Sequence, residues 1–465
     1  MAIAEPAPLK VLDKAAAKRL ASFKATLNLA LKRLAPEFGV ELWDGSTVPE
    51  HLPADYMRVV IADEGVVASL IRAPNLDTYA NLWAAARIDI RNGTIFDLVA
   101  KRPKVRTKEL LKTVGRMSLL RMAARFLFVP RGGPWPLEAI PDDRPSDGSA
   151  DQNKKNIHFH YDLSNAFYQL ILDPEMVYSC AYYTDWNNDL TTAQRDKLEM
   201  VCRRLPLKPG ETYLDIGCGW GALICHAAQN HGVRAHGVTL SEEQFRFATD
   251  KIARLGLGDR VTIELRDYTT VEGQFDKISV LEMSEHVGYE NHPRYYGTIH
   301  RLLKPDGLFM HHAITRPAKR NEKTFRKKRA ERSALTKYVL PGGEFDHIGM
   351  TLTNLERFGF EVHDVESWRE HFQIACRMYH DNLDRNRAAA DREIGAPLTR
   401  IWLAYFAGCS MAFERNTIGL YQVLASKRKR GPSGLPPTRA DLYRQESDSS
   451  KWNSTAAANS SSPLP

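Results

Sequence analysis

Apolar and polar positions follow two different periods along residues 212–315. Short apolar runs predict strands at 212–216, 234–239, 261–265, 275–280 and 308–314. Segments with apolar residues three and four positions apart predict helices at 222–230, 242–255 and 294–303. Because strands and helices alternate, we predict an α/β fold with a doubly wound, mostly parallel sheet and helices on both faces. Ligands of such sheets bind at the carboxyl ends of the strands.

The first part of the chain has a different pattern. Apolar spacing predicts helices at 10–34 and 107–128, and short runs predict strands at 56–61 and 65–71, so we expect a smaller N-terminal α+β domain over 1–129. The second helix has an apolar side and a largely basic side, and a helix of this kind can lie on an anionic membrane surface. A lipid-presenting role follows, although a helix packed on its own domain can have the same pattern. Its basic residues are Lys108, Lys112, Arg116, Arg121 and Arg125.

Composition marks two further boundaries. Residues 130–155 are rich in Pro, Gly, Asp and Ser, which is typical of a linker before a second domain over 156–426. From 427 to 465 the chain is charged and rich in Pro and Ser. We expect this tail to be disordered, because it can bury too little apolar surface.

Charge and cysteine content limit the class of protein only weakly. The net charge of +8 suggests an anionic partner, such as nucleic acid, lipid headgroups or an acidic small molecule. No apolar run approaches the roughly 20 residues that cross a bilayer, and the first residues lack a secretory signal, so we expect a cytoplasmic protein. The 6 cysteines are scattered without metal-ligand pairing, and His158 and His160 lack a third ligand at a suitable spacing. We therefore expect no metal.

A glycine-rich loop carries the strongest chemical signal. The strand at 212–216 contains Asp215, and Gly217, Gly219 and Gly221 then alternate before the next helix. Since glycine has no Cβ, a ligand can approach the backbone, and the amides that open the helix face it. The spacing resembles the cofactor loop of S-adenosylmethionine-dependent methyltransferases. Gly217, Gly219 and Ala222 also satisfy a dinucleotide-binding pattern, so the loop alone leaves both cofactors open.

Several further motifs favour S-adenosylmethionine over a dinucleotide. HYDL at 160–163, YSCAYY at 178–183, DIGCGWG at 215–221 and EHVG at 285–288 occur in this order. Over residues 156–424 the chain resembles the cyclopropane-fatty-acyl-phospholipid synthase family. The resemblance implies a class I methyltransferase fold, S-adenosylmethionine as cofactor, and methyl transfer to the cis double bond of a phospholipid acyl chain. A carbocation then loses a proton to bound bicarbonate and a cyclopropane ring closes, whereas related members produce a methyl or methylene branch.

The resemblance also assigns residues. It implies a catalytic bicarbonate pocket, in which Cys180 acts through its backbone, made of Cys180, Glu285, His312, Ile314 and Tyr338. It implies a cofactor site made of Tyr178, Ser179, Asp215, Gly217, Gly219, Gly221, Thr239, Gln244 and Asp267. Asp267 is placed to accept a hydrogen bond from the adenine amino group. Cap or turn roles for Thr239, Gln244 and Asp267, and a purely structural role for His312, are the alternatives.

Departures from the family pattern leave the product open. Glu282 stands where family members often have a small residue, and Ser284 stands where they often have Phe. This segment looks more like sphingolipid methyltransferases, which do not close a ring. A methyl- or methylene-branched acyl chain is therefore the alternative to a cyclopropane.

The partners expected from the resemblance are lipids. They are unsaturated phospholipid acyl chains at an anionic membrane surface. The enzyme is expected to associate peripherally with the inner face of the membrane. The dense basic stretch 316–332, which lies between His312 and Tyr338, is expected to contact lipid phosphate. Family members are often dimers, so a homodimer is expected. A nucleic-acid methyltransferase is not favoured, because no polar motif for a flipped base is present.

Overall fold

The computed structural model describes residues 13–103, 115–138, 163–327, 337–339 and 343–443. Most of the expected linker, His158, His160, the start of the predicted helix at 107–128 and the tail beyond Tyr443 lie outside these residues.

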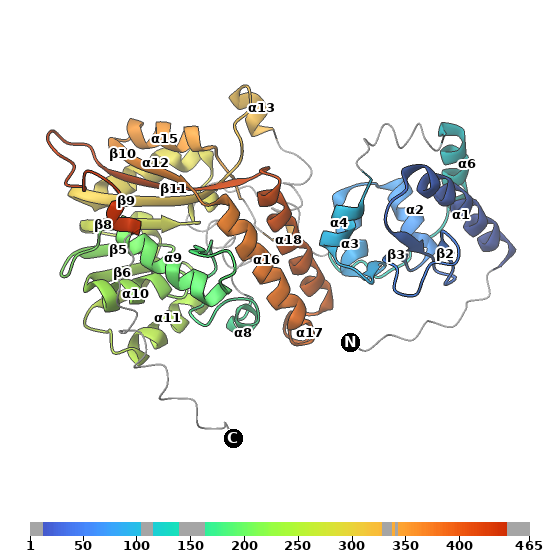
Figure 1. Cartoon of the computed structure of the whole chain (residues 1–465), viewed down its shortest axis with the longest axis horizontal. Coiled ribbons are helices and arrows are strands. Elements are labelled where there is room, and N and C mark those ends of the chain that lie inside the picture. Colours follow the sequence, from blue (N-terminus) through green and yellow to red (C-terminus); the bar gives the residue numbers. More distant parts are fainter. Residues whose placement is uncertain (1–12, 104–114, 139–162, 328–336, 340–342, 444–465) are drawn as a thin grey trace, which may run out of the picture.

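A seven-stranded sheet forms the larger part of the protein (Figure 1). Its strand order is β10-β11-β9-β8-β5-β6-β7. The strands from β7 to β9 are parallel, whereas β11 is antiparallel to both β9 and β10. The strands are β5 (Thr212–Ile216), β6 (Arg234–Thr239), β7 (Val261–Leu265), β8 (Phe275–Leu281), β9 (Leu303–Thr315), β10 (Phe360–Ser367) and β11 (Gly419–Lys427). The predicted doubly wound sheet is confirmed.

Helices cover both faces of this sheet (Figure 1). One apolar core contains Val201, Ile224 and Ile252, which belong to α9 (Leu190–Arg204), α10 (Ala222–His231) and α11 (Glu242–Arg254). The core on the other face contains Tyr295 and Leu355, which belong to α12 (His292–Leu302) and α15 (Ile348–Arg357). Short helices flank these layers: α8 (Asn165–Gln169), η1 (Tyr268–Thr270), η2 (Ser284–His286), η3 (Tyr289–Asn291) and α13 (Glu322–Arg326).

A smaller sheet of order β2-β1-β3-β4 organises the N-terminal part. Its strands are β1 (Gly39–Glu41), β2 (Thr47–Val48), β3 (Arg58–Ile61) and β4 (Ile88–Arg91). Its helices are α1 (Lys14–Leu34), α2 (Glu64–Arg72), α3 (Leu76–Ala84), α4 (Ile95–Lys101) and α6 (Arg116–Phe126). This part is the smaller α+β unit that the sequence predicts.

Helices inserted between β10 and β11 join the two parts. They are α16 (Arg369–Arg385), α17 (Arg387–Ile394) and α18 (Ala396–Glu414), and they lie between the two sheets in Figure 1. Trp83 of α3 donates its indole N–H to the Arg400 carbonyl at 2.9 Å, and Arg400 donates back to the Trp83 carbonyl at 2.6 Å. The same guanidinium pairs with Asp89 at 3.0 Å. The N-terminal part is thus hydrogen-bonded to α18 through a buried arginine.

The strand predicted at 65–71 is wrong, because this segment is helix α2. Asp63 caps it by accepting from the Val66 backbone N–H, and the run from Gly65 to Ser69 is buried on consecutive positions. A short apolar run cannot be assigned to a strand or a helix by periodicity alone, and the β-branched Val66, Val67 and Ile71 favour the strand.

The disorder expected from residue 427 on does not begin there. Arg428 donates to the carbonyls of Glu356 and Phe360, and Lys429 pairs with Asp306. Leu442 lies in the short helix η4 (Ala440–Tyr443) and is buried in the apolar core beside α9. The basic residues after β11 therefore hold this segment to the protein as far as Tyr443.

Within the residues that the structure describes, no helix combines the length and the apolar character needed to cross a lipid bilayer.

Candidate active site

The glycine loop connects the end of β5 to the start of α10. Gly217, Gly219 and Gly221 all have positive φ, at 78°, 55° and 82°, which favours glycine. A Cβ on Gly219 would meet no atom within 4 Å, so this residue faces open space. A Cβ on Gly221 would lie 3.0 Å from the Cβ of Ala248, so this glycine lets α10 pack against α11.

A cavity opens beside this loop at the carboxyl ends of the parallel strands. It is lined by all of the expected cofactor residues except Gly221: Tyr178, Ser179, Asp215, Gly217, Gly219, Thr239, Gln244 and Asp267. The structure thus brings together side chains from segments that are far apart in the sequence. The expected catalytic residues are absent from the described lining, but Glu282 is part of it.

Asp215 is a buried acid at the floor of the cavity. Its Oδ1 accepts from the Ser279 hydroxyl at 2.5 Å, and the Ser279 hydroxyl also lies 2.6 Å from the Tyr213 hydroxyl. Burial raises the pKa of Asp215 to about 6, against the effect of the Ser279 hydrogen bond. A carboxylate desolvated in this way attracts a cationic ligand.

Three other expected cofactor residues have local hydrogen bonds as well. Thr239 donates its hydroxyl to Gln244 Oε1 at 2.7 Å, which fixes the side chain of Gln244. Asp267 caps η1, and its Oδ1 accepts from the backbone N–H and hydroxyl of Thr269 at 2.8 and 2.7 Å. The cap role weighed for Asp267 is therefore real, and it coexists with a place in the cavity wall.

Glu282 connects the cavity to the expected catalytic residues. Its Oε1 accepts from the backbone N–H of Cys180 at 2.7 Å and lies 3.2 Å from Nε2 of His312. Glu282 has a φ of 52°, and its own N–H donates to the His312 carbonyl at 2.7 Å. Burial raises its pKa to about 7. The carboxylate thus occupies two of the groups that the resemblance assigns to bicarbonate.

His312 is a neutral, buried imidazole. Desolvation holds its pKa well below the ordinary value of 6.5. Its Nδ1 lies 3.2 Å from the side-chain nitrogen of Gln422, and its ring meets Trp368 edge to face. With the Gln422 amide in this orientation its nitrogen donates to Nδ1, which places the imidazole proton on Nε2, 3.2 Å from Glu282 Oε1.

Glu285 is a second buried carboxyl group, held by the strand that carries His312. Its Oε1 accepts from the Ile314 backbone N–H at 2.6 Å. Burial, followed by the nearby Glu282, raises its pKa to about 8. Glu285 is therefore largely protonated near neutral pH and can donate a hydrogen bond.

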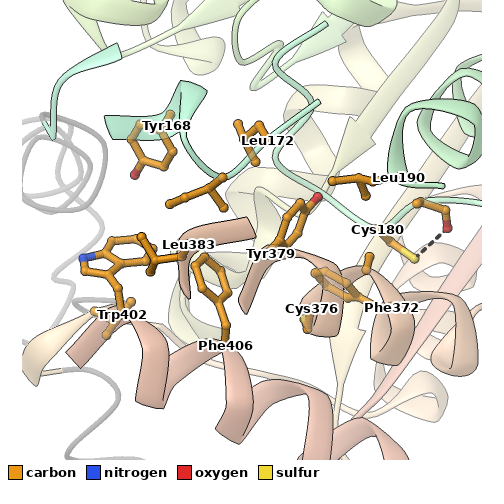
Figure 2. Packing of buried hydrophobic residues seen from close by; sticks show 14 of the residues in the cluster. Tyr168, Leu172, Cys180, Leu190, Phe372, Cys376, Tyr379, Leu383, Trp402 and Phe406 are labelled. Carbon is orange, nitrogen blue, oxygen red and sulfur yellow. Dashed lines mark hydrogen bonds between the residues drawn. The ribbon is translucent and has the colours of Figure 1, made fainter. Parts of the chain in front are cut away.

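The Cys180 thiol is unsuited to nucleophilic chemistry. Figure 2 shows this side chain packed among apolar residues of α16 and the segment around Leu190. Its Sγ donates to the Ala181 carbonyl at 3.1 Å, and burial raises the thiol pKa well above 9.0. A thiolate is disfavoured there, so only the backbone N–H of Cys180 serves the site.

Tyr338 differs from the other expected catalytic residues. Its hydroxyl donates to Asp77 of α3 at 2.9 Å, and Lys337 pairs with the same carboxylate at 3.3 Å. The structure thus links Tyr338 to the N-terminal part, whereas Cys180, Glu282 and His312 contact one another.

Part of the basic stretch is held within the protein. Arg316 donates to the Phe345 carbonyl at 3.0 Å, and its guanidinium lies 3.8 Å from the centre of the Phe325 ring. Arg326 pairs with Glu290 at 3.3 Å. Residues 328–332 lie outside the described part of the chain. These two arginines have structural partners, which weakens the expectation that they contact lipid.

Lys197 is a buried cation in the cavity wall that was not predicted from the sequence. Its Nζ donates to the Ser179 hydroxyl at 3.0 Å, and burial lowers its pKa. Glu282 and Asp215 act in the opposite direction on that pKa. Nothing in the sequence marked this residue, because a lysine in a polar helix such as α9 normally lies in solvent.

The raised pKa of Glu285 predicts how stability depends on pH. Between its ordinary pKa of 4.5 and about 8, the unfolded chain has lost this proton whereas the folded protein retains it. The free energy of unfolding should therefore fall as pH rises through this window, by up to about 1.4 kcal/mol per pH unit from this group. Glu285→Gln should flatten the decline, which urea unfolding at several pH values would measure. Equal slopes in both proteins would contradict the buried, protonated carboxyl group.

Comparison with known proteins agrees with this geometry. The sequence profile of the family described as mycolic acid cyclopropane synthetase matches residues 148–423. The chain belongs to this family. Among solved structures, the cyclopropane synthase MmaA2 from Mycobacterium tuberculosis has a TM-score of 0.55 at 26% identity, covering 59% of this chain and 98% of that protein. The mycolic acid cyclopropane synthase CmaA1, complexed with SAH and CTAB, has a TM-score of 0.55 at 28% identity, with coverages of 58% and 97%. The larger part of the chain thus has the class I S-adenosylmethionine-dependent methyltransferase fold.

The relatives include fatty acid methyltransferases and a cyclopropane synthase. A probable fatty acid methyltransferase of Pseudomonas putida is 38% identical over 316 residues, which cover 66% of this chain and 77% of the relative. A tuberculostearic acid methyltransferase of M. tuberculosis is 35% identical over 386 residues, with coverages of 80% and 87%. The cyclopropane-fatty-acyl-phospholipid synthase of Escherichia coli is 35% identical over 279 residues, with coverages of 58% and 66%.

Proposed function

We propose that this protein transfers a methyl group from S-adenosylmethionine to a cis double bond of an unsaturated acyl chain, and that Glu282 removes the proton that the carbocation releases. The observation that carries the proposal is the Glu282 carboxylate, which lies on the Cys180 backbone N–H and beside His312. The similarity to two fatty acid methyltransferases supports an acyl substrate and a branched product.

The residues around the cavity suit S-adenosylmethionine. When bound, this cofactor supplies a methyl group on a positively charged sulfur. Gly219 leaves room for a ligand against the loop, and the buried carboxylate of Asp215 favours a cation. Asp267 and Glu282 add two further acidic groups to the lining. An alkene is a weak nucleophile, so holding it in line with the methyl carbon must supply much of the barrier reduction.

The reaction balances without any further reagent. The π electron pair of the alkene forms the new carbon–methyl bond as the sulfur–methyl bond breaks, and the second alkene carbon becomes cationic. A hydride shift from the methylated carbon moves the charge to that carbon. A methyl proton then passes to Glu282, and the electron pair of that C–H bond forms a methylene branch. The products are S-adenosylhomocysteine, the methylene-branched chain and one proton, whereas a saturated methyl branch would need a separate reductant.

Glu282 has the properties of a base for this step. A pKa of about 7 makes it a stronger proton acceptor than an ordinary carboxylate while it remains partly ionised at neutral pH. Cys180, His312 and Trp368 are all buried, which limits the access of water to Glu282 on their side. A dry site protects a carbocation from water. The neighbouring neutral His312 adds no positive charge that would oppose the cation.

A cyclopropane product is the second candidate. It needs loss of the same methyl proton, with ring closure in place of the hydride shift. The close grouping of Cys180, Glu285, His312 and Ile314 favours it, because the resemblance assigns these residues to a pocket in which bicarbonate takes the proton. In this alternative Glu282 must move away from the Cys180 backbone N–H, because the Glu282 carboxylate and bicarbonate would both accept a hydrogen bond from this one donor.

The product distinguishes the two candidates. The purified protein is incubated with methyl-labelled S-adenosylmethionine and vesicles of cis-unsaturated phospholipid, and the extracted lipid is examined by proton NMR. We expect vinylidene proton signals from a methylene branch. High-field ring protons alone would establish the second candidate, and no label in the lipid would refute both. A parallel reaction with the free unsaturated fatty acid tests whether the acyl chain must be esterified.

Helix α6 has the surface of a membrane-binding element. Met122 and Phe126 are buried against α2, whereas Met117, Leu120 and Phe128 are 61%, 64% and 95% exposed. Met117 and Leu120 share one helical face with the exposed Arg121 and Arg125, and Phe128 follows just beyond the end of the helix. A face that combines large apolar side chains with arginines suits the interface of an anionic bilayer. We propose that this face docks the enzyme on anionic phospholipid.

This docking predicts a loss of vesicle binding on substitution. Leu120→Ser combined with Phe128→Ser should weaken binding to anionic phospholipid vesicles at least about 10-fold, because two large apolar groups no longer enter the interface. Vesicle sedimentation would measure it. Leu255→Ser, at a 38% exposed position after α11, is the matched control and should bind normally. Equal binding by all three proteins would refute the docking face.

A further inference from the structure

A cluster of potential metal ligands lies between α9 and α10. Glu199 and Cys202 are one helical turn apart on α9, and His226 and His231 lie on α10. The described lining of the cofactor cavity includes none of the four, and the proposed reaction does not use them. Figure 1 shows the two helices as neighbours beside the larger sheet, and they contact each other.

Three donor atoms of the cluster lie close together, and Glu199 bridges the two histidines. Nε2 of His226 and Nε2 of His231 each lie 3.1 Å from Oε2 of Glu199. The Cys202 sulfur and a ring nitrogen from each histidine all lie within 4.8 Å of one another. Zinc bonds of about 2.0–2.3 Å place tetrahedral ligands about 3.3–3.6 Å apart. The separations between the cysteine sulfur and the two ring nitrogens must therefore shorten by up to about 1.2–1.5 Å to complete the coordination.

The chemical types of the ligands match zinc. A thiolate, imidazoles and a carboxylate form a common zinc donor set, whereas magnesium and calcium prefer oxygen alone. Cys202 is fully buried and His226 nearly so, while the side chains of His231 and Glu199 are 18% and 31% exposed. An ion can thus reach the cluster from the side of His231.

Neighbouring groups can orient these ligands. Arg203 donates to Glu199 Oε1 at 2.8 Å, which directs the other carboxylate oxygen toward the histidines. The Asn230 side-chain amide lies 3.1 Å from Nδ1 of His226. The same amide nitrogen donates to the His226 carbonyl at 3.0 Å, so Asn230 fixes the orientation of the His226 ring.

We propose that Glu199, Cys202, His226 and His231 bind one zinc ion. The ion would tie α9 to the last turn of α10, the helix whose first turn follows the glycine loop. This site cannot be recognised from the sequence, because its two pairs of ligands lie on separate helices and have no characteristic spacing. Without an ion, the same residues form a hydrogen-bond network around Glu199.

Metal binding by the full-length protein tests the proposal. The chelator-treated protein is titrated with Zn²⁺ alone by calorimetry, and with Co²⁺ alone while absorption is recorded. We expect one Zn²⁺ per chain, and a cobalt charge-transfer band that requires a thiolate ligand. Removing an outer hydrogen-bond partner of a metal ligand usually weakens metal binding about 10–100-fold, so we expect Asn230→Ala to weaken Zn²⁺ binding within this range. His231→Gln removes a ligand itself and should weaken Zn²⁺ binding by more than this range.

The cysteine variants separate a site from nonspecific binding. Cys202→Ser should abolish the cobalt band, whereas Cys225→Ser, which changes a buried cysteine of α10 outside the cluster, should retain it. Because His231 is partly exposed, His231→Gln is expected to fold even if Cys202→Ser does not. Absence of stoichiometric Zn²⁺ binding, or binding unaffected by His231→Gln, would leave only the hydrogen-bond network and overturn the proposal.

Discussion

Replacing Glu282 with glutamine should lower the rate of methyl transfer to lipid by about 10²–10⁴-fold, the usual contribution of a positioned general base. The amide oxygen can still accept from the Cys180 N–H, so the local structure should remain. It no longer accepts a proton, however. Affinity for S-adenosylhomocysteine, which has no sulfonium charge, should be unchanged. Single-turnover methyl transfer and calorimetry measure the two quantities separately, and a wild-type rate in Glu282→Gln would exclude Glu282 as the base.

Glycine at this position should change the source of the base. Glu282 has a φ of 52°, which glycine adopts easily, so Glu282→Gly should fold. It would leave the Cys180 N–H and His312 open to an external anion. We expect the activity of this variant to depend on added bicarbonate, with ring protons appearing in the NMR spectrum of the lipid. If the activity of Glu282→Gly did not depend on the bicarbonate concentration, the Cys180 N–H and His312 would not form an anion site.

Replacing Gly219 with valine should reduce cofactor affinity by at least about 100-fold, which corresponds to about 2.7 kcal/mol. The new side chain would project into the open space that Gly219 faces, where the cofactor must approach the loop. Calorimetry with S-adenosylhomocysteine measures this loss.

A second glycine separates blockage of the site from backbone strain. Gly256 has a φ of 64°, close to the 55° of Gly219, and a Cβ there would also meet nothing within 4 Å. It lies after α11, and the described lining of the cavity does not include it. Gly256→Val should therefore suffer similar strain but bind cofactor normally. If both variants lost cofactor affinity equally, backbone strain and reduced stability would explain the loss, and blockage of the cofactor site would not be needed.

Local patterns were sufficient for most of the larger sheet. β5, β6 and β7 have the bounds that apolar runs predict, because each run is short and is followed by a clear turn or helix signal. The pattern failed at α2, because its apolar run is short and contains β-branched residues that are typical of strands. It also failed after β11, where basic residues that suggest a solvated tail bind backbone carbonyls and acidic groups of the sheet.

The sequence by itself determined the family, the class of fold and the position of the glycine loop, because these depend on local spacing and on motifs in a fixed order. It also marked Glu282 as a departure from the family pattern. Only the tertiary structure showed where that carboxylate lies, because a φ of 52° turns it onto the N–H of a residue from a distant segment. Burial then set the protonation of Glu282, Glu285 and His312, since desolvation depends on every element packed around a group. The protonation states that bear on product choice are therefore properties of the folded site, whereas the cofactor class could be read from the chain.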